Sequence, residues 1–350
     1  MRAHVESAPE LENRARQRRA ELAHKIASLM GSKEKWVTDV PGLTLVRRTK
    51  VVAPGCGTYE PSIALIAQGR KEVELGKRSF VYDESRYLLT SVDLPISSRP
   101  LEASEERPLL ALALSLDIEV VQELLSKDEI PLGGAASDDP AMVTGETTPE
   151  LLDACCRLVG LLETPKDIPF LNGLIQREIV YRILQGPEAA RLRAIATRGN
   201  QSQRTTKAIS WIKSNFSKPL RVEELAHMAG MGVSTFHNHF RALTAMSPLQ
   251  YQKQLRLQTA RSRMLLDGLD AASAAFEVGY ESASQFNREY SRFFGQSPMR
   301  DIRALRSSSA SPIDVAPAPS RAPAPRHHAA TRRAPVGSPT PRTAPAARTS

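Results

Sequence analysis

The feature that most restricts the fold is a pattern that occurs twice in the last third of the chain. The first copy has the pattern of a helix over 222–229, a tight turn at 230–232 and a second helix from Val233. The same three parts return about 50 residues later, over 271–293. Two crossed helices joined by a tight turn form a helix-turn-helix unit, whose second helix enters the major groove of DNA. A pattern of this kind is much less expected to occur twice by chance than once.

Local signals predict how the helices of this repeat begin. Ser282, followed three residues later by Gln285, fits a capping box, in which Gln285 would serve as a cap instead of a base reader. Ser247 and Pro248 predict the N-cap and first residue of a helix over 248–266. At 1.5 Å per residue this helix spans about 28 Å, which would place the two recognition helices near the roughly 34 Å repeat of the major groove.

The charge of the chain is divided unevenly. The formal net charge is +9, of which residues 201–306 contribute +7 and the tail from 307 contributes +5, so residues 1–200 carry −3. A basic C-terminal half beside an acidic N-terminal half predicts a polyanionic partner for the C-terminal half alone.

The first two thirds of the chain predict a different architecture. Short apolar runs about ten residues apart predict an antiparallel barrel or sandwich, and amphipathic helices follow it. A segment rich in Gly, Asp and Thr, residues 133–148, has the composition of a loop. The expected domains are an N-terminal helix within 1–39, the sheet domain with its helices over 40–197, a linker at 198–203, an all-helical domain over 204–306, and a disordered tail rich in Pro, Ala and Arg over 307–350.

Five short motifs of the helical domain carry a family resemblance. They are Glu224-Leu225-Ala226; Ser247-Pro248 with Tyr251; Arg256-Leu257 with Ala260; Val278-Gly279-Tyr280 with Ser282, Ser284, Phe286 and Arg288; and Gly295-Gln296-Ser297-Pro298. These residues resemble the C-terminal signature of the AraC/XylS family of transcription regulators. The resemblance covers the whole of 204–302.

The resemblance implies which residues face DNA. The positions that correspond to the family's base-facing residues are Ser234, His237 and Asn238 in the first copy and Ser284, Gln285, Asn287 and Arg288 in the second. Arg288 suits guanine, and Asn238 or Gln285 suits adenine. Arg241 and Arg292 are better placed for phosphates.

Four positions of this domain depart from the family pattern. Arg221 and Gly232 stand where the family has N-cap residues, and Ala271 and Ala274 stand where it has larger aliphatic side chains. Weaker capping and a thinner core together are expected to make both units less stable than usual, since a lost cap costs about 1 kcal/mol.

The front half resembles the family's N-terminal domain, which is a cupin-like barrel that senses a small effector. The residues that carry this resemblance are Tyr59-Glu60-Pro61-Ser62, Ala67-Gln68-Gly69 with Lys71, Tyr82-Asp83, and Tyr87-Leu88-Leu89 with Ser91-Val92-Asp93-Leu94-Pro95. The expected fold class is therefore α+β, with an N-terminal cupin-like β-barrel with flanking helices and a C-terminal all-α domain.

Enzyme chemistry finds little support in the residue types. No histidine occurs between Ile26 and Ala226, so the barrel has no histidine for a metal site or a catalytic triad. Carboxylates alone, such as Glu60, Asp83 and Asp93, make a poor transition-metal site. The histidines of the helical domain, His227, His237 and His239, lack the Cys or carboxylate partners of a zinc spacing. We expect neither catalysis nor a cofactor or metal.

An architectural DNA-binding protein, whose barrel only dimerises, remains an alternative. A ligand pocket lined by Tyr59, Tyr82 or Tyr87 would argue against it, although such tyrosines are more often barrel core. The sequence does not decide between the two.

The sequence thus predicts a DNA-binding transcription regulator with promoter DNA as its partner. A small-molecule effector, RNA polymerase and a second copy of the chain are further expected partners. No apolar run approaches the roughly 18 residues of a membrane helix, and the three cysteines fit a reducing compartment, so a cytoplasmic location is expected.

Overall fold

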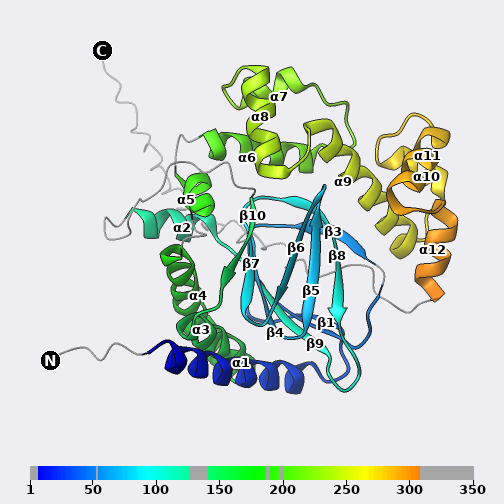
Figure 1. The fold of residues 1–350 in the computed structure, drawn as a ribbon. Helices are drawn as coiled ribbons and strands as arrows, with labels where there is room; N and C mark the ends of the chain where they lie inside the picture. Colours follow the sequence, from blue (N-terminus) through cyan, green and yellow to red (C-terminus); the bar gives the residue numbers. More distant parts are fainter. Residues whose placement is uncertain (1–6, 53, 127–140, 187–189, 198–200, 308–350) are drawn as a thin grey trace, which may run out of the picture. The chain divides into compact units, whose positions relative to one another are not determined.

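The structure is a computed structural model that describes residues 7–52, 54–126, 141–186, 190–197 and 201–307. The predicted disordered tail lies outside these residues, except for Ser307. The N-terminal part contains the strands and the first helices (Figure 1). Its strands are β1 (Lys35–Val37), β2 (Leu43–Arg48), β3 (Gly55–Tyr59), β4 (Ser62–Gln68), β5 (Arg70–Leu75), β6 (Arg78–Asp83), β7 (Arg86–Thr90), β8 (Leu94–Glu102), β9 (Leu109–Ser115) and β10 (Met142–Glu146).

These strands form two antiparallel sheets, as the spacing of the apolar runs predicts. One has the order β1-β2-β9-β4-β7-β10 and the other the order β3-β8-β5-β6. Ile63 of β4 lies between Leu89 of β7 and Leu114 of β9, and all three side chains are buried. The α+β fold class with a sheet-rich N-terminal domain is confirmed.

One strand lies where we expected a loop. Within 133–148, residues 142–146 form β10, which pairs with β7 from Met142↔Thr90 to Glu146↔Arg86. Gly145 gives room for the ring of Tyr87, because a Cβ at this position would lie 2.4 Å from that ring. The loop prediction was wrong here. The residues Thr144-Gly145-Glu146 have a loop-like composition, but pairing with β7 stabilises them as a strand.

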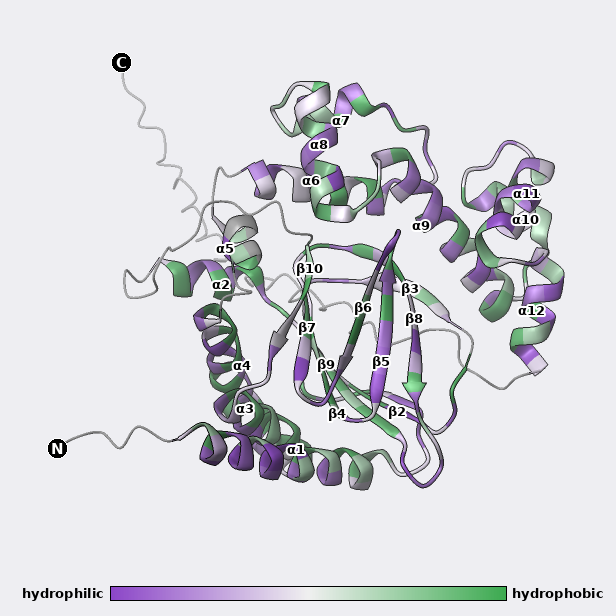
Figure 2. Ribbon diagram, in the orientation of Figure 1, coloured by the Kyte–Doolittle hydropathy of each residue, from purple (hydrophilic) through white to green (hydrophobic). Residues whose placement is uncertain are grey.

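Helices also belong to the N-terminal part, and the first lies against the larger sheet. They are α1 (Ala8–Met30), α2 (Ile118–Leu125), α3 (Pro149–Gly160), α4 (Ile168–Gln185) and α5 (Ala190–Ala196), with short 3-10 turns at Leu161–Glu163 and Pro165–Asp167. Helix α1 contacts β2, β4 and β9, and α3 lies against both α1 and α4. The predicted N-terminal helix is therefore present as α1. It is amphipathic: Leu22, Ile26 and Met30 are buried along one side, and its other side is polar (Figure 2).

The C-terminal part is helical throughout its described length. Its helices are α6 (Gln201–Ser214), α7 (Val222–Met228), α8 (Val233–Thr244), α9 (Pro248–Ser262), α10 (Ala271–Glu277), α11 (Ala283–Phe294) and α12 (Pro298–Ser307). Helix α9 continues into a π-helical turn at Arg263–Asp267, so the predicted helix over 248–266 is present. Residues 201–203, which we expected in a linker, belong to α6, and 198–200 lie outside the described residues.

Candidate DNA-binding surface

Helices α7 and α8 form the first helix-turn-helix unit, called unit 1 from here on. Gly230 adopts φ +60° in the turn between them, a conformation that favours glycine. Phe236 and Phe240 of α8 are fully buried, with ring centroids 5.6 Å apart, and they belong to the same apolar core as Leu225 of α7. The 3.6-residue period of the helix therefore turns other residues of α8 outward.

The predicted DNA-facing residues of unit 1 lie on this outer side. Ser234, Asn238 and Arg241 are exposed, and His237 is partly buried. Arg241 makes no ion pair with any residue that the structure describes. The face therefore offers hydrogen-bonding groups and one cationic group to a partner.

Neither helix of unit 1 begins with a side-chain cap. Arg221 and Gly232 occupy the N-cap positions of α7 and α8, and neither gives a side-chain hydrogen bond to the first turn. The weak capping expected from these two residues is confirmed for this unit.

Helices α10 and α11 form the second unit, called unit 2 from here on, and both are capped. The Asp270 carboxylate accepts hydrogen bonds from the backbone N–H groups of Ala272 and Ser273 at 2.9 and 3.0 Å. The Ser282 hydroxyl accepts one from the N–H of Gln285 at 3.4 Å. The N-cap predicted at Ser282 is therefore confirmed, and the cap at Asp270 is one that we did not predict.

The role expected for the Gln285 side chain was wrong. Its amide does not return to the backbone of Ser282 to complete a capping box; it donates to Glu289 at 3.4 Å. All of the predicted DNA-facing residues of unit 2 are exposed on α11, namely Ser284, Gln285, Asn287, Arg288 and Arg292. Phe286 and Tyr290 are buried on the opposite side of the helix.

Helix α9 joins the two units and is held at its start and near its middle. Ser247 and Gln250 form a complete capping box at its start. Near its middle the guanidinium of Arg256 donates to the carbonyl of Phe216 at 2.7 Å, in the segment between α6 and α7. The carbonyl of the next residue, Ser217, lies so near Gly279 that a Cβ there would be 2.0 Å away. Backbone contact thus ties the turn of unit 2 to this segment.

A buried polar network that the sequence did not predict lies beneath unit 2. The Asp301 carboxylate accepts two hydrogen bonds from Arg261 and one from the hydroxyl of Tyr290, each 2.7 Å long. Burial lowers the pKa of Arg261, but the bonds to Asp301 outweigh it and hold the pKa above its usual value. Burial and the bond to Asp301 both raise the pKa of Tyr290. The network crosses from α9 to α11 and α12.

A second unpredicted group joins α6 to the strands. The Lys213 ammonium lies 2.6 Å from carboxylate oxygens of both Glu60 and Asp93. Burial lowers the pKa of Lys213, but its two carboxylate partners outweigh it, and the pKa is raised. The hydroxyl of Tyr251 on α9 donates to the carbonyl of Asp93 at 2.7 Å. Two carboxylates that we weighed as metal ligands thus hold a lysine.

The side chains that we considered for chemistry in the barrel have structural partners. Tyr59, Tyr82 and Tyr87 are buried, and the Tyr59 hydroxyl accepts a hydrogen bond from the buried ammonium of Lys71 at 2.9 Å. Asp83 accepts bonds from the backbone and hydroxyl of Ser85. Over the described residues, no group of three His, Cys, Asp or Glu side chains is arranged to hold a metal ion.

Cys155 and Cys156 lie in the core of the N-terminal part. Burial raises the pKa of each thiol to about 12, so neither is a thiolate near neutral pH. Among the helices that the structure describes, none is long and apolar enough to span a membrane.

Comparison with known proteins agrees with this geometry. Residues 39–191 match the model of the AraC-type transcriptional regulator N-terminus, and residues 225–304 match a helix-turn-helix domain model. The regulator ArgR of Pseudomonas aeruginosa is 25% identical over 44% of this chain and 46% of its own length. The activator RhaS of Yersinia pestis is 29% identical over 30% of this chain and 38% of its own length. Each match spans less than half of the relative.

Solved structures show the same fold at low identity. One is ToxT from Vibrio cholerae O395 bound to (E)-4-(8-methylnaphthalen-1-yl)but-3-enoic acid, with a TM-score of 0.51 and 10% identity, covering 75% of this chain and 98% of that one. The two matched regions account for both the sheet domain and the pair of helix-turn-helix units. This chain therefore belongs to the AraC/XylS family of transcriptional regulators.

Proposed function

We propose that the chain is a sequence-specific DNA-binding regulator of transcription. The observation that carries this proposal is the pair of helix-turn-helix units, each with a buried aromatic side and an exposed polar side on its second helix. The two second helices would enter successive major grooves on one face of promoter DNA.

The residues divide into base readers and phosphate contacts. Arg288 has the two parallel donors that match O6 and N7 of guanine, and Asn238 or Gln285 fits adenine. Ser234, His237, Ser284 and Asn287 are the other base-facing residues that we propose. Arg241 and Arg292 would bind phosphates, which fix register and orientation without reading sequence.

The test is selection of random-sequence DNA by the full chain. We expect an enriched motif with two half-sites about 10 base pairs apart. Arg288→Ala should cost roughly 1 to 3 kcal/mol of binding free energy and relax specificity at one base. The matched control is Arg303→Ala, which removes an equal charge from an exposed position on α12. Binding without enrichment would contradict base reading and leave the architectural alternative, in which the barrel only dimerises.

We further propose that a small-molecule effector controls the protein through the sheet domain. The effector can change DNA occupancy only by the difference in its affinity for two states of the protein. The match of residues 39–191 to a regulator N-terminal domain supports this. The similarly folded ToxT has been solved with a carboxylic acid bound. We also propose that the protein contacts RNA polymerase, that it pairs with a second copy of the chain, and that it is located in the cytoplasm.

A further inference from the structure

The turn between β5 and β6 lies against the first recognition helix. Gly76 adopts φ +61° in this turn, and a Cβ there would lie 3.3 Å from the carbonyl oxygen of Ala245. Ala245 ends α8 and is itself left-handed, with φ 58°. The two left-handed residues lie against each other, so the turn contacts Ala245 and Met246 in the link between α8 and α9.

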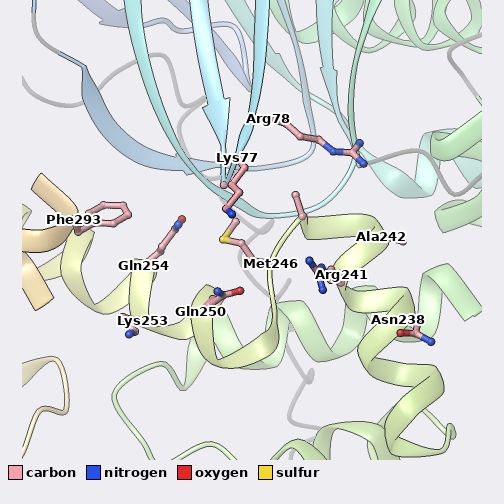
Figure 3. A pocket seen from close by; sticks show the side chains of 12 residues that line it. Lys77, Arg78, Asn238, Arg241, Ala242, Met246, Gln250, Lys253, Gln254 and Phe293 are labelled. Carbon is pink, nitrogen blue, oxygen red and sulfur yellow. The ribbon is translucent and has the colours of Figure 1, made fainter.

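A cavity of about 730 Å³ opens beside this contact. The turn contributes Lys77, the first residue of β6 contributes Arg78, helix α8 contributes Asn238 and Arg241, and α9 contributes Lys253. Figure 3 shows Lys77 extending from the turn toward Met246, with Arg241 and Gln250 on the helices that face it. We call this cavity the basic seam.

The charge of the basic seam has one sign. Four of its twelve lining residues are Lys or Arg, and none is Asp or Glu. Lys253 lies 3.6 Å from Glu289, whereas Lys77, Arg78 and Arg241 form no ion pair with any described residue. Cationic side chains that lie together without carboxylates repel one another. An anion bound in the seam would reduce this electrostatic repulsion.

We propose that the basic seam binds the phosphate backbone of DNA, so that the β5–β6 turn of the sheet domain is part of the DNA-binding surface. This inference rests on the proposed function. DNA phosphate is the anion that fits, because the lining includes Arg241, which we propose as a phosphate contact of α8, about one helical turn from the proposed base reader Asn238. A DNA strand whose bases meet α8 would carry its phosphates past the end of that helix. Exposed Lys, Arg, Asn and Gln side chains are the usual donors to phosphate oxygens.

The inference assigns a role to two residues outside the helix-turn-helix units. Lys77 and Arg78 would act as positioning contacts that hold the sheet domain against the DNA and orient α8. They would add affinity without sequence information. The full chain would then show a steeper salt dependence of DNA binding than the two units alone supply.

The experiment is a salt titration of DNA binding by the full chain, using the sequence enriched in the selection above. In the variant Lys77→Ala/Arg78→Ala, each lost contact should reduce the slope of log K against log salt by about 0.9 and weaken binding roughly tenfold at 0.1 M salt. The matched control is Lys50→Ala/Arg86→Ala. Both of its residues are exposed and outside the seam, and Arg86 begins β7 at the end of β6 remote from Arg78. This control should change neither the slope nor the affinity beyond a small effect of net charge.

Two further variants complete the test. Lys77→Arg/Arg78→Lys keeps both charges and should bind like the original chain. Thermal unfolding of every variant should be unchanged, because both side chains are exposed. An Ala/Ala variant with the original slope and affinity overturns the inference, and so does one that binds more tightly, since the turn would then cover the reading face. In either case the original chain still binds its selected sequence, whereas a chain that binds no DNA would overturn the proposed function itself.

Discussion

The two helix-turn-helix units have the same outline but are stabilised differently. Unit 1 shares one continuous apolar core with the sheet domain, and its helices begin without side-chain caps. Unit 2 has a separate and smaller core, two capped helices and the buried network around Asp301. Unit 1 thus depends on its neighbour for stability, and unit 2 depends on polar groups of its own. A repeat in sequence does not imply a repeat in energetics.

Asp301→Ala is expected to have the largest effect, and on unit 2 alone. The side chains of Arg261 and Asp301 are only 10% and 3% exposed. Removing the carboxylate leaves a buried cation without its partner, which costs about 3 to 5 kcal/mol. Urea unfolding of the full chain, followed by circular dichroism, should show an early loss of part of the helical signal.

Asp267→Ala is the control for this prediction, because it breaks an ion pair of the same type with Arg263 at the surface. It should cost less than about 0.5 kcal/mol. Equal effects of the two substitutions would show that unit 2 does not depend on its buried network.

Sequence reasoning succeeded where the signal was local. The helices of both units, the cap at Ser247 and the turn at Gly230 each depend on residues within one or two helical turns. It failed for Asp301 and Arg261, which are 40 residues apart, because no periodicity or cap signal pairs them. It also failed for Gln285. Its side chain can reach either the backbone of Ser282 or the carboxylate of Glu289, and it donates to Glu289.

The basic seam could not be predicted from the sequence for the same reason. Its cations come from a turn at 76–78 and from helices that begin more than 150 residues later. Nothing in the composition of a Gly-Lys-Arg turn distinguishes a solvent-exposed hairpin from one seated on a recognition helix. The one trace in the sequence is Gly76 itself, since a tight turn that meets another backbone favours glycine.

Lys213→Met is expected to have the second largest effect, and on the contact between the sheet domain and α6, which packs against both helices of unit 1. The substitution leaves Glu60 and Asp93 facing each other without their cation. We expect a loss of about 1 to 3 kcal/mol, less than for Asp301 because the Lys213 side chain is 34% exposed. The double variant Lys213→Met/Asp93→Asn should recover part of the loss, measured by urea unfolding. No recovery would mean that the two groups do not act as a pair.

The same lysine predicts a pH dependence of stability. Its pKa is raised in the folded chain above the ordinary 10.5. While Glu60 and Asp93 are ionised, the stabilisation is therefore complete below pH 10.5 and is lost as the pH rises through the folded pKa. The difference in unfolding free energy between the original chain and Lys213→Met should shrink at this alkaline end. A difference that stays constant above pH 10.5 would contradict the assignment to the charged ammonium.

Ser282→Ala should have a smaller effect, again on unit 2. The hydroxyl caps α11 through the N–H of Gln285, and losing an N-cap costs about 1 kcal/mol. Ser284→Ala removes a hydroxyl from the same helix that makes no cap, so its unfolding free energy should stay within about 0.5 kcal/mol of the original. Both variants are compared in thermal unfolding. If they are equally stable, the hydrogen bond of 3.4 Å contributes nothing measurable.

Gly232→Ser tests whether the missing cap of unit 1 can be supplied, and its effect should be the smallest. Gly232 has φ −67° and ψ 152°, an extended conformation that serine adopts readily, and a Cβ there meets no atom within 4 Å. Serine should therefore stabilise unit 1 by a few tenths of a kcal/mol, because glycine is itself a tolerable N-cap. Gly232→Ala is the control: it adds the same Cβ without a cap and should destabilise the unit. If alanine stabilises as much as serine, the gain comes from a less flexible unfolded chain, and the comparison of capping between the two units loses its energetic basis.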